Sequence, residues 1–550
     1  MLAADDTYFT LVGTAFQPDG TLSRALAAIG RAHRHTMAQS DYAQRVARTF
    51  ASGRDERGPA VSLLEGETGL GKTQGYLIPL AILCARRGQR GAIAVPLAAA
   101  TDPNLHAELA LAIDIAAELT GRRLTFATRF APGDFISRDR VAAVRSALPA
   151  HRDEVQAALA MLERACDEGG RLADLLRDHG PLPVPIQAAD ICGNADGAAY
   201  RAHLPAAQAA DIVIMPHGLL LDALDDGLDG ETFACVAVDE ADRLAAAMTR
   251  PPDWTSPFAD ALCLTGAALD IDGSDVGFRT LRRRLGLDDG GHDDISGRLT
   301  LPRFGALAFN LSHPSAPRPT VDGERVSKDN ARNPHWYDYV EGVLTEVAAL
   351  RQRTLVLTCN ARDTAELERR LTTRRIAVIA HRPDGRLADT LDAFAADRAA
   401  ILIGSGLWER VNLPGLVKHL VVTRLPIGHH DAPDVPGLSA QEIERQALAA
   451  VMLEARRLLK LGIGRAIRQA GDEAHLWITD PRFPLPSSLA DNPRLQLPSC
   501  APSHKAFSAC IPERFRAGLF ATYPQATIID PALRPTGVDS TQSSGRRARH

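Results

Sequence analysis

The chain of 550 residues is long enough for two or three domains with sizeable hydrophobic cores. Hydrophobic residues make up 45% and charged residues 23% of the sequence, as in ordinary globular proteins. It contains no run of about 18 uncharged apolar residues, and its first residues lack the basic start and apolar run of a signal peptide. These features exclude a membrane-spanning or secreted protein, so we expect a cytoplasmic chain without a membrane partner.

Cysteines and charges narrow the function classes further. The eight cysteines are scattered without a Cys-x-x-Cys pair, which argues against a disulfide or zinc framework. The net charge of −5 neither favours nor excludes nucleic acid, because a motor can bind phosphates in a local channel while the chain stays acidic. Only five basic residues are lysines, so a motif that requires Lys rarely arises here by chance.

Short apolar segments alternate with helical ones along the first half. The first 60 residues or so are predicted to be helical, and a strand, a Gly-rich turn and a helix follow between 61 and 88. Further buried strands are predicted at 91–97, 211–217, 233–242 and 261–269, and a long Ala-rich helical region at 104–180. Alternating strands and helices predict a parallel α/β sheet.

A second α/β domain follows a polar stretch. Residues 270–335 are rich in Gly, Asp, Pro and Arg and are expected to form an irregular linker. Strands are then predicted within 353–360, 375–381, 399–406, 419–428 and 475–480, and a long helix at 439–470. The residues from about 534 have the composition of a disordered tail.

The segment GETGLGKT at 66–73 fits the phosphate-loop pattern GxxxxGK[ST]. Gly66, Gly69 and Gly71, with Thr68 between them, would let backbone N–H groups wrap phosphates at the start of a helix. Lys72 would reach the β and γ phosphates, and Thr73 would hold Mg²⁺. The alternative is a Gly turn that merely precedes a helix.

The segment VAVDEAD at 236–242 ends a predicted strand in two carboxylates. Asp239 would bind Mg²⁺, and Glu240 would orient or deprotonate the attacking water. The alternative is a solvated acidic turn, because Asp-Glu-Ala-Asp alone is a weak signal.

With these motifs, GLWERVNLPG (406–415) and GIGRAIR (462–468) resemble the DinG/XPD branch of superfamily 2 helicases. The resemblance extends from about residue 35 to 485 and is greatest to the DinG helicases of type IV CRISPR systems. It implies an α/β chain with two RecA-like parallel-sheet domains and a mostly helical insertion, a vestigial iron–sulfur-type domain, in the first. The expected parts are helicase domain 1 at 1–102 and 206–300, the insertion at 103–205, helicase domain 2 at 301–490 and a C-terminal extension at 491–550.

The resemblance also assigns roles to single residues. Gln39 would contact adenine. Arg465 and Arg468, three apart on a predicted helix, would stabilise the γ-phosphate in the transition state, because Arg binds phosphate oxygens in a bidentate way. The alternative is a pair of solvated arginines. Trp408 would either stack on a base or belong to the core, and both interpretations stay open.

Several positions depart from the family pattern. Iron–sulfur ligation needs four thiolates in range, yet the interval between the two nucleotide motifs has only Cys84, Cys166, Cys192 and Cys235, with Ser137 at the first ligand position. We therefore predict no iron–sulfur cluster. About 20 residues separate Asp242 from Leu264, so the family's arch domain is absent or minimal. Within the motifs, the departures are Arg410, Asn412 and Leu461.

The resulting expectation is an ATP hydrolase that uses ATP and Mg²⁺ to move 5′ to 3′ on single-stranded DNA. Its partners would be tailed or R-loop DNA and a CRISPR guide-RNA effector complex. One alternative is a stand-alone DinG-like repair helicase. Another is a weakly active ATP-dependent single-strand clamp, favoured by Asn412 and Leu461. A metabolic kinase is disfavoured, because it would leave 406–415 and 462–468 unexplained.

Overall fold

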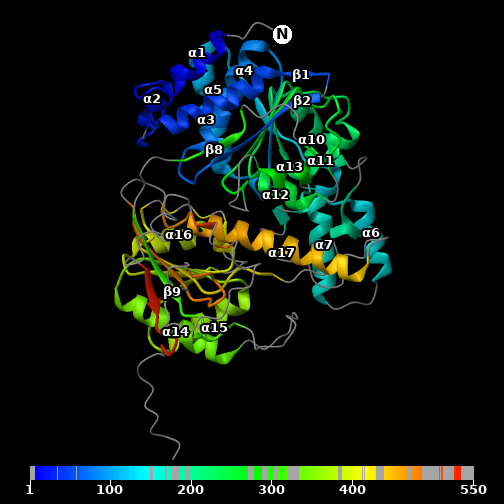
Figure 1. The fold of residues 1–550 in the computed structure, drawn as a ribbon. Coiled ribbons are helices and arrows are strands. Elements are labelled where there is room, and N and C mark those ends of the chain that lie inside the picture. The colour runs from blue at the N-terminus through cyan, green and yellow to red at the C-terminus, as the bar shows by residue number, and fades with distance from the viewer. Residues whose placement is uncertain are drawn as a thin grey trace, which may run out of the picture. The chain divides into compact units, whose positions relative to one another are not determined.

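The computed structural model divides into two compact units (Figure 1), unit 1 with residues 1–270 and 275–301, and unit 2 with residues 271–274 and 302–550. The described residues are 6–33, 35–56, 58–148, 153–167, 170–172, 174–175, 186, 188–193, 198–248, 251–270, 278–287, 295–300, 306–319, 333–381, 387–409, 411, 413, 415–428, 439–467, 472–485, 507, 510–511 and 526–533. Each unit is built on its own sheet, and each is treated separately below.

The sheet of unit 1 has the order β1-β2-β7-β6-β3-β5-β4, with β8 also paired to β2. All pairs are parallel except β1–β2. The strands are β1 Arg54–Asp55, β2 Gly58–Gly66, β3 Gly91–Val95, β4 Phe126–Thr128, β5 Ile212–Pro216, β6 Cys235–Val238, β7 Ala261–Gly266 and β8 Gly297–Leu299. Because β2, β7 and β6 are adjacent and parallel, their carboxyl ends lie along one edge of the sheet.

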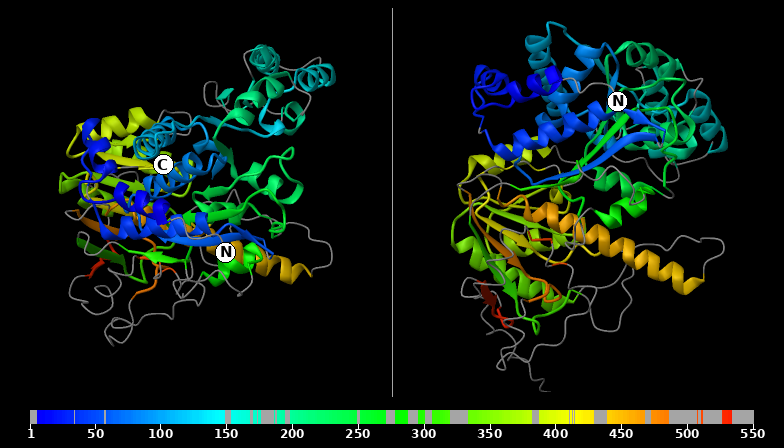
Figure 2. Two further views of the ribbon diagram at one scale, coloured as in Figure 1. Left: turned by 90° about the horizontal axis from the view of Figure 1, so that it is seen from above. Right: turned by 45° about the horizontal axis from the view of Figure 1, so that its top comes forward.

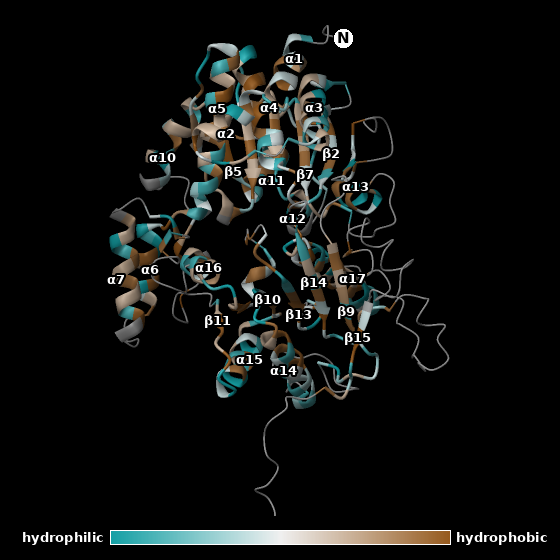
Figure 3. Cartoon of the chain, turned by 90° about the vertical axis from the view of Figure 1, so that its left-hand side faces the viewer, coloured by the Kyte–Doolittle hydropathy of each residue, from teal (hydrophilic) through white to brown (hydrophobic). Residues whose placement is uncertain are grey.

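Helices cover both faces of this sheet (Figure 2). One face carries α3 (Met37–Ser52) and α4 (Lys72–Arg87). On these helices pack α1 (Asp6–Ala15) and α5 (Pro103–Thr120), and α2 (Thr21–Ala28) packs on α1 and α5. The other face carries α11 (His217–Asp226), α12 (Ala241–Ala247) and α13 (Arg279–Leu285). Alternate residues such as Leu63, Val238 and Leu264 bury toward this second face, as the period of two requires. Figure 3 shows the hydrophobic colouring along β2 and β7.

The helical insertion of unit 1 has a small core of its own. It includes α6 (Arg138–Ala147), α7 (Asp153–Asp167) and α9 (Ala188–Ile191), and α10 (Ala198–Ala209), which contacts β4, leads the chain on to β5. Val141, Leu159, Leu162 and Ile191 are buried together there. Short 3-10 turns, η1 (Leu97–Ala99) and η2 (Pro132–Asp134), lie on the way into it.

Unit 2 has a parallel sheet with the order β11-β12-β10-β13-β14-β9-β15. Its strands are β9 Ala306–Ser312, β10 Thr354–Leu357, β11 Ile379–Ala380, β12 Ile401–Gly404, β13 His419–Val422, β14 Glu473–Ile478 and β15 Ala526–Ile529. Its helices are α14 (Pro334–Ala349), α15 (Ala361–Thr373), α16 (Leu387–Ala396) and α17 (Ala440–Ile463), with the 3-10 turn η3 (Gly406–Trp408). α14 and α15 bury Trp336, Val340 and Leu367 against Val356 and Ile403 of the sheet.

The predicted fold class, two α/β domains on parallel sheets, is confirmed. Three local predictions were wrong. The region 104–180 contains the strand β4, the supposed linker 270–335 contains α13, β8 and β9, and the helix predicted at 439–470 ends at Ile463. The domain boundaries stay predictions, and the tail from 534 lies outside the described residues. Among the described helices, none is long and apolar enough to cross a membrane.

Candidate nucleotide site

The phosphate loop lies between the fully buried strand β2 and the first residue of α4, Lys72. Gly69 and Gly71 have φ angles of 89° and 83°, a region that favours glycine. A Cβ atom on Gly66 would lie 2.8 Å from Cγ of Lys72, so this glycine lets the lysine fold over the loop. Lys72 Nζ donates to the carbonyls of Gly66 at 2.9 Å and Glu67 at 3.3 Å. The ammonium group therefore sits at the mouth of the loop.

Gln39 contacts this loop from α3, whose first turn is capped by the side chain of Thr36. Gln39 is 6% exposed, and its Nε2 donates to the carbonyl of Gly71 at 3.3 Å. Its Oε1 accepts from His33 Nε2 at 3.0 Å. A Cβ atom on Gly71 would lie 2.1 Å from Gln39 Nε2, so glycine at 71 permits this approach. Gln39, the residue predicted to contact adenine, is therefore hydrogen-bonded to the predicted phosphate loop.

Asp239 follows β6, and its carboxylate accepts three hydrogen bonds. Tyr76 of α4 donates its hydroxyl to Oδ2 at 2.8 Å. Oδ1 accepts from the main-chain N–H of Glu240 at 2.9 Å and from Thr265 Oγ1 at 3.3 Å. Residues from α4, β6 and β7 thus meet at the carboxyl edge of the sheet.

The surroundings of Asp239 suit a hard cation. Burial first, and then the charge of Asp239, raise the pKa of Tyr76 well above its usual value, so its hydroxyl remains a donor. A carboxylate has about four lone-pair positions, so Oδ2 keeps acceptor capacity beyond Tyr76. Thr73 precedes Tyr76 by three helical residues, which places both on one face of α4, toward Asp239. Hydroxyl and carboxylate oxygens are ligands that Mg²⁺ accepts, so Thr73 and Asp239 fit that ion.

Glu240 differs from Asp239 in backbone and exposure. Its φ angle is 49°, which is uncommon for a residue with a side chain and is found at functional sites. Its side chain is 45% exposed, and its Oε2 accepts from Arg243 at 3.2 Å. The side chain can therefore reach solvent beside Asp239, as a group that orients water requires.

The sequence did not predict that Tyr76, Thr265 and His217 contact Asp239. His217 Nε2 donates a hydrogen bond to the main-chain carbonyl of Asp239, the residue that follows β6, at 2.8 Å. Burial lowers the pKa of His217 to about 4, so the ring is neutral at pH 7. The apolar strand before His217 was the available signal, since it predicts that the residue after it lies at the carboxyl edge.

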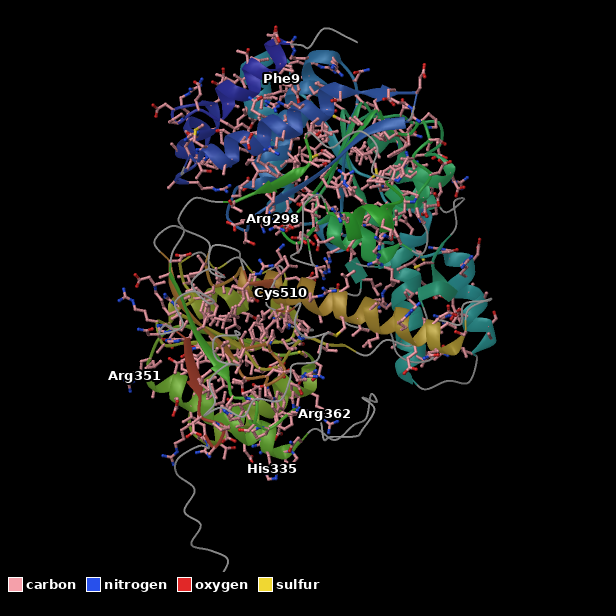
Figure 4. The ribbon with its side chains drawn as sticks, in the orientation of Figure 1. Phe9, Arg298, His335, Arg351, Arg362 and Cys510 are labelled. Atoms are coloured by element: carbon pink, nitrogen blue, oxygen red, sulfur yellow. The ribbon has the colours of Figure 1, made fainter. Side chains whose placement is uncertain are left out.

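A cluster of ion pairs links β8 to the end of β2, next to the phosphate loop. Arg298 of β8, labelled in Figure 4, pairs with Glu65 of β2 at 3.0 Å and with Asp270. The main-chain N–H of Asp270 also donates to Glu65 Oε2 at 2.6 Å. These contacts hold β8 against the last residues of β2, which lead into the loop.

Arg465 lies in unit 2, in the turn that follows the C-cap Gly464 of α17 and not on the helix itself. Its Nη1 donates to the carbonyl of Val411 at 2.6 Å, and its Nε and Nη2 lie 3.4 Å from the carbonyl of Trp408. Arg465 therefore contacts the segment 406–415. Arg468 lies outside the described residues, as do Arg410, Asn412 and Pro414.

Trp408 is a core residue of unit 2. It is 4% exposed, and its Nε1 donates to the carbonyl of Thr358 at 2.6 Å. A Cβ atom on Gly462 would lie 2.7 Å from its ring, so α17 packs closely over it. Its neighbour Glu409 pairs with the buried Arg457 of α17 at 2.6 Å. Of the two interpretations left open for Trp408, the structure favours the core.

The cysteines of the insertion lie near each other without forming a metal centre. Ile136, next to Ser137, forms an antiparallel bridge with Cys192, and Cys166 Sγ lies 3.8 Å from the carbonyl of Ile136. Burial raises the pKa of the Cys192 thiol to about 11. Within the described residues, no group of three or more His, Cys, Asp or Glu is placed to hold a metal. The absence of an iron–sulfur cluster stays a prediction.

Cys84 and Cys235 are buried in the core of unit 1. Between α12 and β7, the described residues 251–260 form turns and neither a helix nor a strand. The residues 249–250 of that connection lie outside the description.

The phosphate loop and the carboxylate pair on a parallel sheet have the arrangement that α/β nucleotide-binding proteins use. Comparisons with known proteins narrow this class. Residues 343–491 match the family described as the helicase C-terminal domain. The chain is also 25% identical, over 239 residues, to the "3'-5' exonuclease DinG" of Bacillus subtilis (strain 168), a match that covers 41% of this chain and 24% of that protein. The chain thus spans about a quarter of the length of this relative.

Solved structures match the chain at low identity and with TM-scores below 0.5. One titled XPD helicase is 12% identical with a TM-score of 0.46, and the match covers 82% of this chain and 96% of that one. The helicase Lhr of Mycobacterium smegmatis, bound to single-stranded DNA and AMP-PNP, is 13% identical with a TM-score of 0.41, and the match covers 92% of this chain and 56% of that one. Residues 343–491 thus resemble helicase C-terminal domains, and part of the chain resembles DinG.

Proposed function

We propose that the chain is an ATP-driven DNA helicase that translocates 5′ to 3′ along a single strand. The observation that carries this proposal is the joint position of the phosphate loop and Asp239 at one sheet edge of unit 1. Unit 2 contributes the segment that matches helicase C-terminal domains. A nucleotide site in one unit and a helicase module in the other are the parts that such a motor needs.

Each residue at the edge has a proposed task. Lys72 binds the β and γ phosphates, and the N–H groups of 68–71 surround them. Thr73 and Asp239 hold Mg²⁺, which supplies charge neutralisation on the phosphates. Glu240 orients the attacking water. Gln39 reads the adenine base, because it already touches the loop at Gly71.

Arg465 and Arg468 are proposed to bind the γ-phosphate as negative charge spreads in the transition state. Arg465 currently donates to the carbonyls of Val411 and Trp408. Contact with phosphate would exchange these carbonyls for phosphate oxygens and would release the segment 406–415. The resemblance implies that this segment binds the nucleic acid. Arg465 would therefore couple ATP binding and hydrolysis to the affinity of the segment 406–415 for the DNA strand.

The proposed substrate is tailed or R-loop DNA, and the proposed recruiter is a type IV CRISPR guide-RNA effector complex. Both come from the family resemblance of 406–415 and 462–468. A stand-alone DinG-like repair helicase would use the same residues. If the effector is the partner, an effector bound to an R-loop captures the purified chain, and an R-loop without effector does not.

The test is ATP-driven unwinding of two duplexes that carry either a 5′ or a 3′ single-stranded tail. We expect opening of the 5′-tailed duplex alone and loss of opening in Lys72→Ala. Opening of the 3′-tailed duplex would refute the polarity. If neither opens while single strands still stimulate ATP hydrolysis, the chain is a clamp and not a helicase.

A further inference from the structure

A chain of hydrogen bonds runs from α2 to the phosphate loop. Ser23 Oγ lies 2.7 Å from Nδ1 of His33, and His33 Nε2 lies 3.0 Å from Oε1 of Gln39. Gln39 Nε2 in turn lies 3.3 Å from the carbonyl oxygen of Gly71. These contacts join α2, the connection to α3, α3 itself and the loop.

The chemistry of these groups fixes the direction of two of the three bonds. The carbonyl of Gly71 can only accept, so Gln39 must present its amide N–H there. The other amide atom, Oε1, can only accept, so His33 must carry a proton on Nε2. The third hydrogen bond joins Nδ1 of His33 to the Ser23 hydroxyl. A flipped Gln39 amide would place donor against donor and acceptor against acceptor.

The held amide still has one donor and one acceptor to offer. Nε2 has a second N–H, and Oε1 has a second lone pair. Adenine presents an acceptor, N7, beside a donor, the N6 amino group, and a Gln amide pairs with both. Guanine presents two acceptors, N7 and O6, so one of them would face Oε1. The orientation of Gln39 therefore favours adenine over guanine.

We propose that His33, held by Ser23, is a positioning residue that gives the nucleotide site its selectivity for adenine. His33 acts through Gln39 and does not itself touch the nucleotide. The inference rests on the proposed function, because it requires the base to lie against Gln39. Gly71 belongs to the same device, since a Cβ atom there would lie 2.1 Å from Gln39 Nε2.

Removal of His33 frees the amide to rotate. With Oε1 released, the NH₂ group can turn toward O6 of guanine, and the cost of binding guanine falls. A bidentate contact to a base is worth about five- to a hundredfold in discrimination, and loss of its fixed orientation should remove about tenfold. A merely structural role would lower the affinities for both nucleotides together and leave their ratio unchanged.

The experiment compares equilibrium binding of fluorescent ATP and GTP analogues with Mg²⁺ to the full chain. Wild type should prefer ATP, and His33→Ala should lower the ATP/GTP affinity ratio about tenfold. His33→Gln keeps an N–H donor and should restore most of the ratio. The matched control is His35→Ala, because His35 Nε2 contacts Ser40 Oγ at 3.1 Å and not Gln39.

The outcomes distinguish failure of the proposed role of His33 from failure of the proposed nucleotide site. An unchanged ratio in His33→Ala, with ATP binding that still depends on Lys72, overturns the role of His33 and leaves the nucleotide site intact. A lowered ratio that His33→Gln fails to restore also contradicts the proposed hydrogen bond. Wild-type ATP binding that Lys72→Ala does not weaken refutes the nucleotide site, and the inference fails with it.

Discussion

Asp239 at the carboxyl edge of the unit 1 sheet has hydrogen-bond partners of a different kind from those of two buried carboxylates at the carboxyl edge of the unit 2 sheet. In unit 2, Asp363 accepts from Arg424 Nε at 3.0 Å and Asp480 from Arg482 Nη2 at 2.6 Å. Burial alone would raise the pKa of Asp480, but the paired Arg482 outweighs it and the pKa is lowered. In unit 1, the hydrogen bonds to Asp239 come from neutral groups, Tyr76, Thr265 and the N–H of Glu240.

The kind of partner distinguishes a carboxylate that can bind a ligand from one that stabilises the fold. A carboxylate matched to a buried arginine has its charge neutralised within the protein, and breaking the pair costs stability. A carboxylate oriented by neutral donors keeps its charge for a cation that arrives with the substrate. Variants of Asp239 and of the groups around it should therefore alter nucleotide chemistry, and variants of Asp363 or Asp480 should alter folding.

The largest effect should follow Glu240→Gln. Loss of the group that orients water should lower ATP hydrolysis about a thousandfold, while ATP binding through Lys72 remains. Steady-state hydrolysis and nucleotide binding measure the two effects. The control is Glu118→Gln on α5, where the glutamate is 55% exposed and pairs with Arg24. Hydrolysis within tenfold of wild type would contradict the role of Glu240.

Asp363→Asn should destabilise unit 2 by about 3 kcal/mol, because it leaves Arg424, 9% exposed, without its charge partner. Denaturant unfolding measures the loss, and Asp392→Asn, an exposed aspartate of α16, is the control. Nucleotide binding by the folded protein should persist. A stable variant with weak ATP binding would mean that the unit 2 edge is itself a ligand site.

The core position of Trp408 predicts the result of Trp408→Leu. Lost packing and the lost hydrogen bond to Thr358 should reduce the free energy of unfolding by about 2–3 kcal/mol. Single-stranded DNA affinity, measured below the unfolding transition, should stay the same. A stacked base is worth about 1–3 kcal/mol. Unchanged stability with affinity lowered more than tenfold would restore the stacking interpretation.

Protonation of His419 should lower the stability of unit 2 as the pH falls. Burial and the neighbouring His475 lower the pKa of His419 to about 4, below its unfolded value of about 6.5. The unfolded chain therefore binds the proton first, so stability falls as pH drops from about 6.5 to 4, on the order of 2 kcal/mol. Protonation also opposes the bond from Trp477 Nε1 to His419 Nδ1.

Calorimetric unfolding across that pH range measures this effect in wild type and His419→Phe. The variant should lose part of the pH slope. His335→Phe is the control, because this histidine is 64% exposed on α14. Identical slopes in wild type and His419→Phe would show that His419 does not carry the acid sensitivity.

The smallest effect should come from Tyr76→Phe. Without the donor to Oδ2, the Asp239 carboxylate loses one restraint, and the Mg²⁺ affinity of the nucleotide complex should fall about fivefold. Mg²⁺ titration of fluorescent ATP binding measures it. Tyr8→Phe is a matched control, since Tyr8 is equally buried and donates to Pro79 of the same helix at 3.0 Å. Equal Mg²⁺ affinity in Tyr76→Phe and wild type would contradict this role.

Local patterns predicted the elements that carry the nucleotide motifs. The strand, turn and helix around 58–87 are contiguous, so their periodicity and glycines sufficed. The strand β9 was missed because its polar flanks dominate the composition of 270–335, and β15 pairs with β9 from more than 200 residues away. The end of α17 at Ile463 was missed because an apolar pattern continues past Gly462 and Gly464.

The contacts within the site were harder to predict than its residues. Tyr76 and Asp239 are 163 residues apart, and only the sheet order brings α4 beside the end of β6. His33 and Gln39 are six residues apart, but their contact depends on the bend before α3 and on a glycine at 71. Sequence motifs identify the reacting groups, and the fold supplies the residues that orient them.

The most direct test of the central claim is ATP hydrolysis with and without single-stranded DNA, in wild type and in Lys72→Ala. A nucleic-acid motor should hydrolyse ATP slowly alone, should accelerate about tenfold or more with the strand, and should lose both activities in the variant. An ATP hydrolysis rate that single-stranded DNA does not change would contradict the proposal of a nucleic-acid motor. ATP hydrolysis that is retained in Lys72→Ala would contradict the proposed nucleotide site.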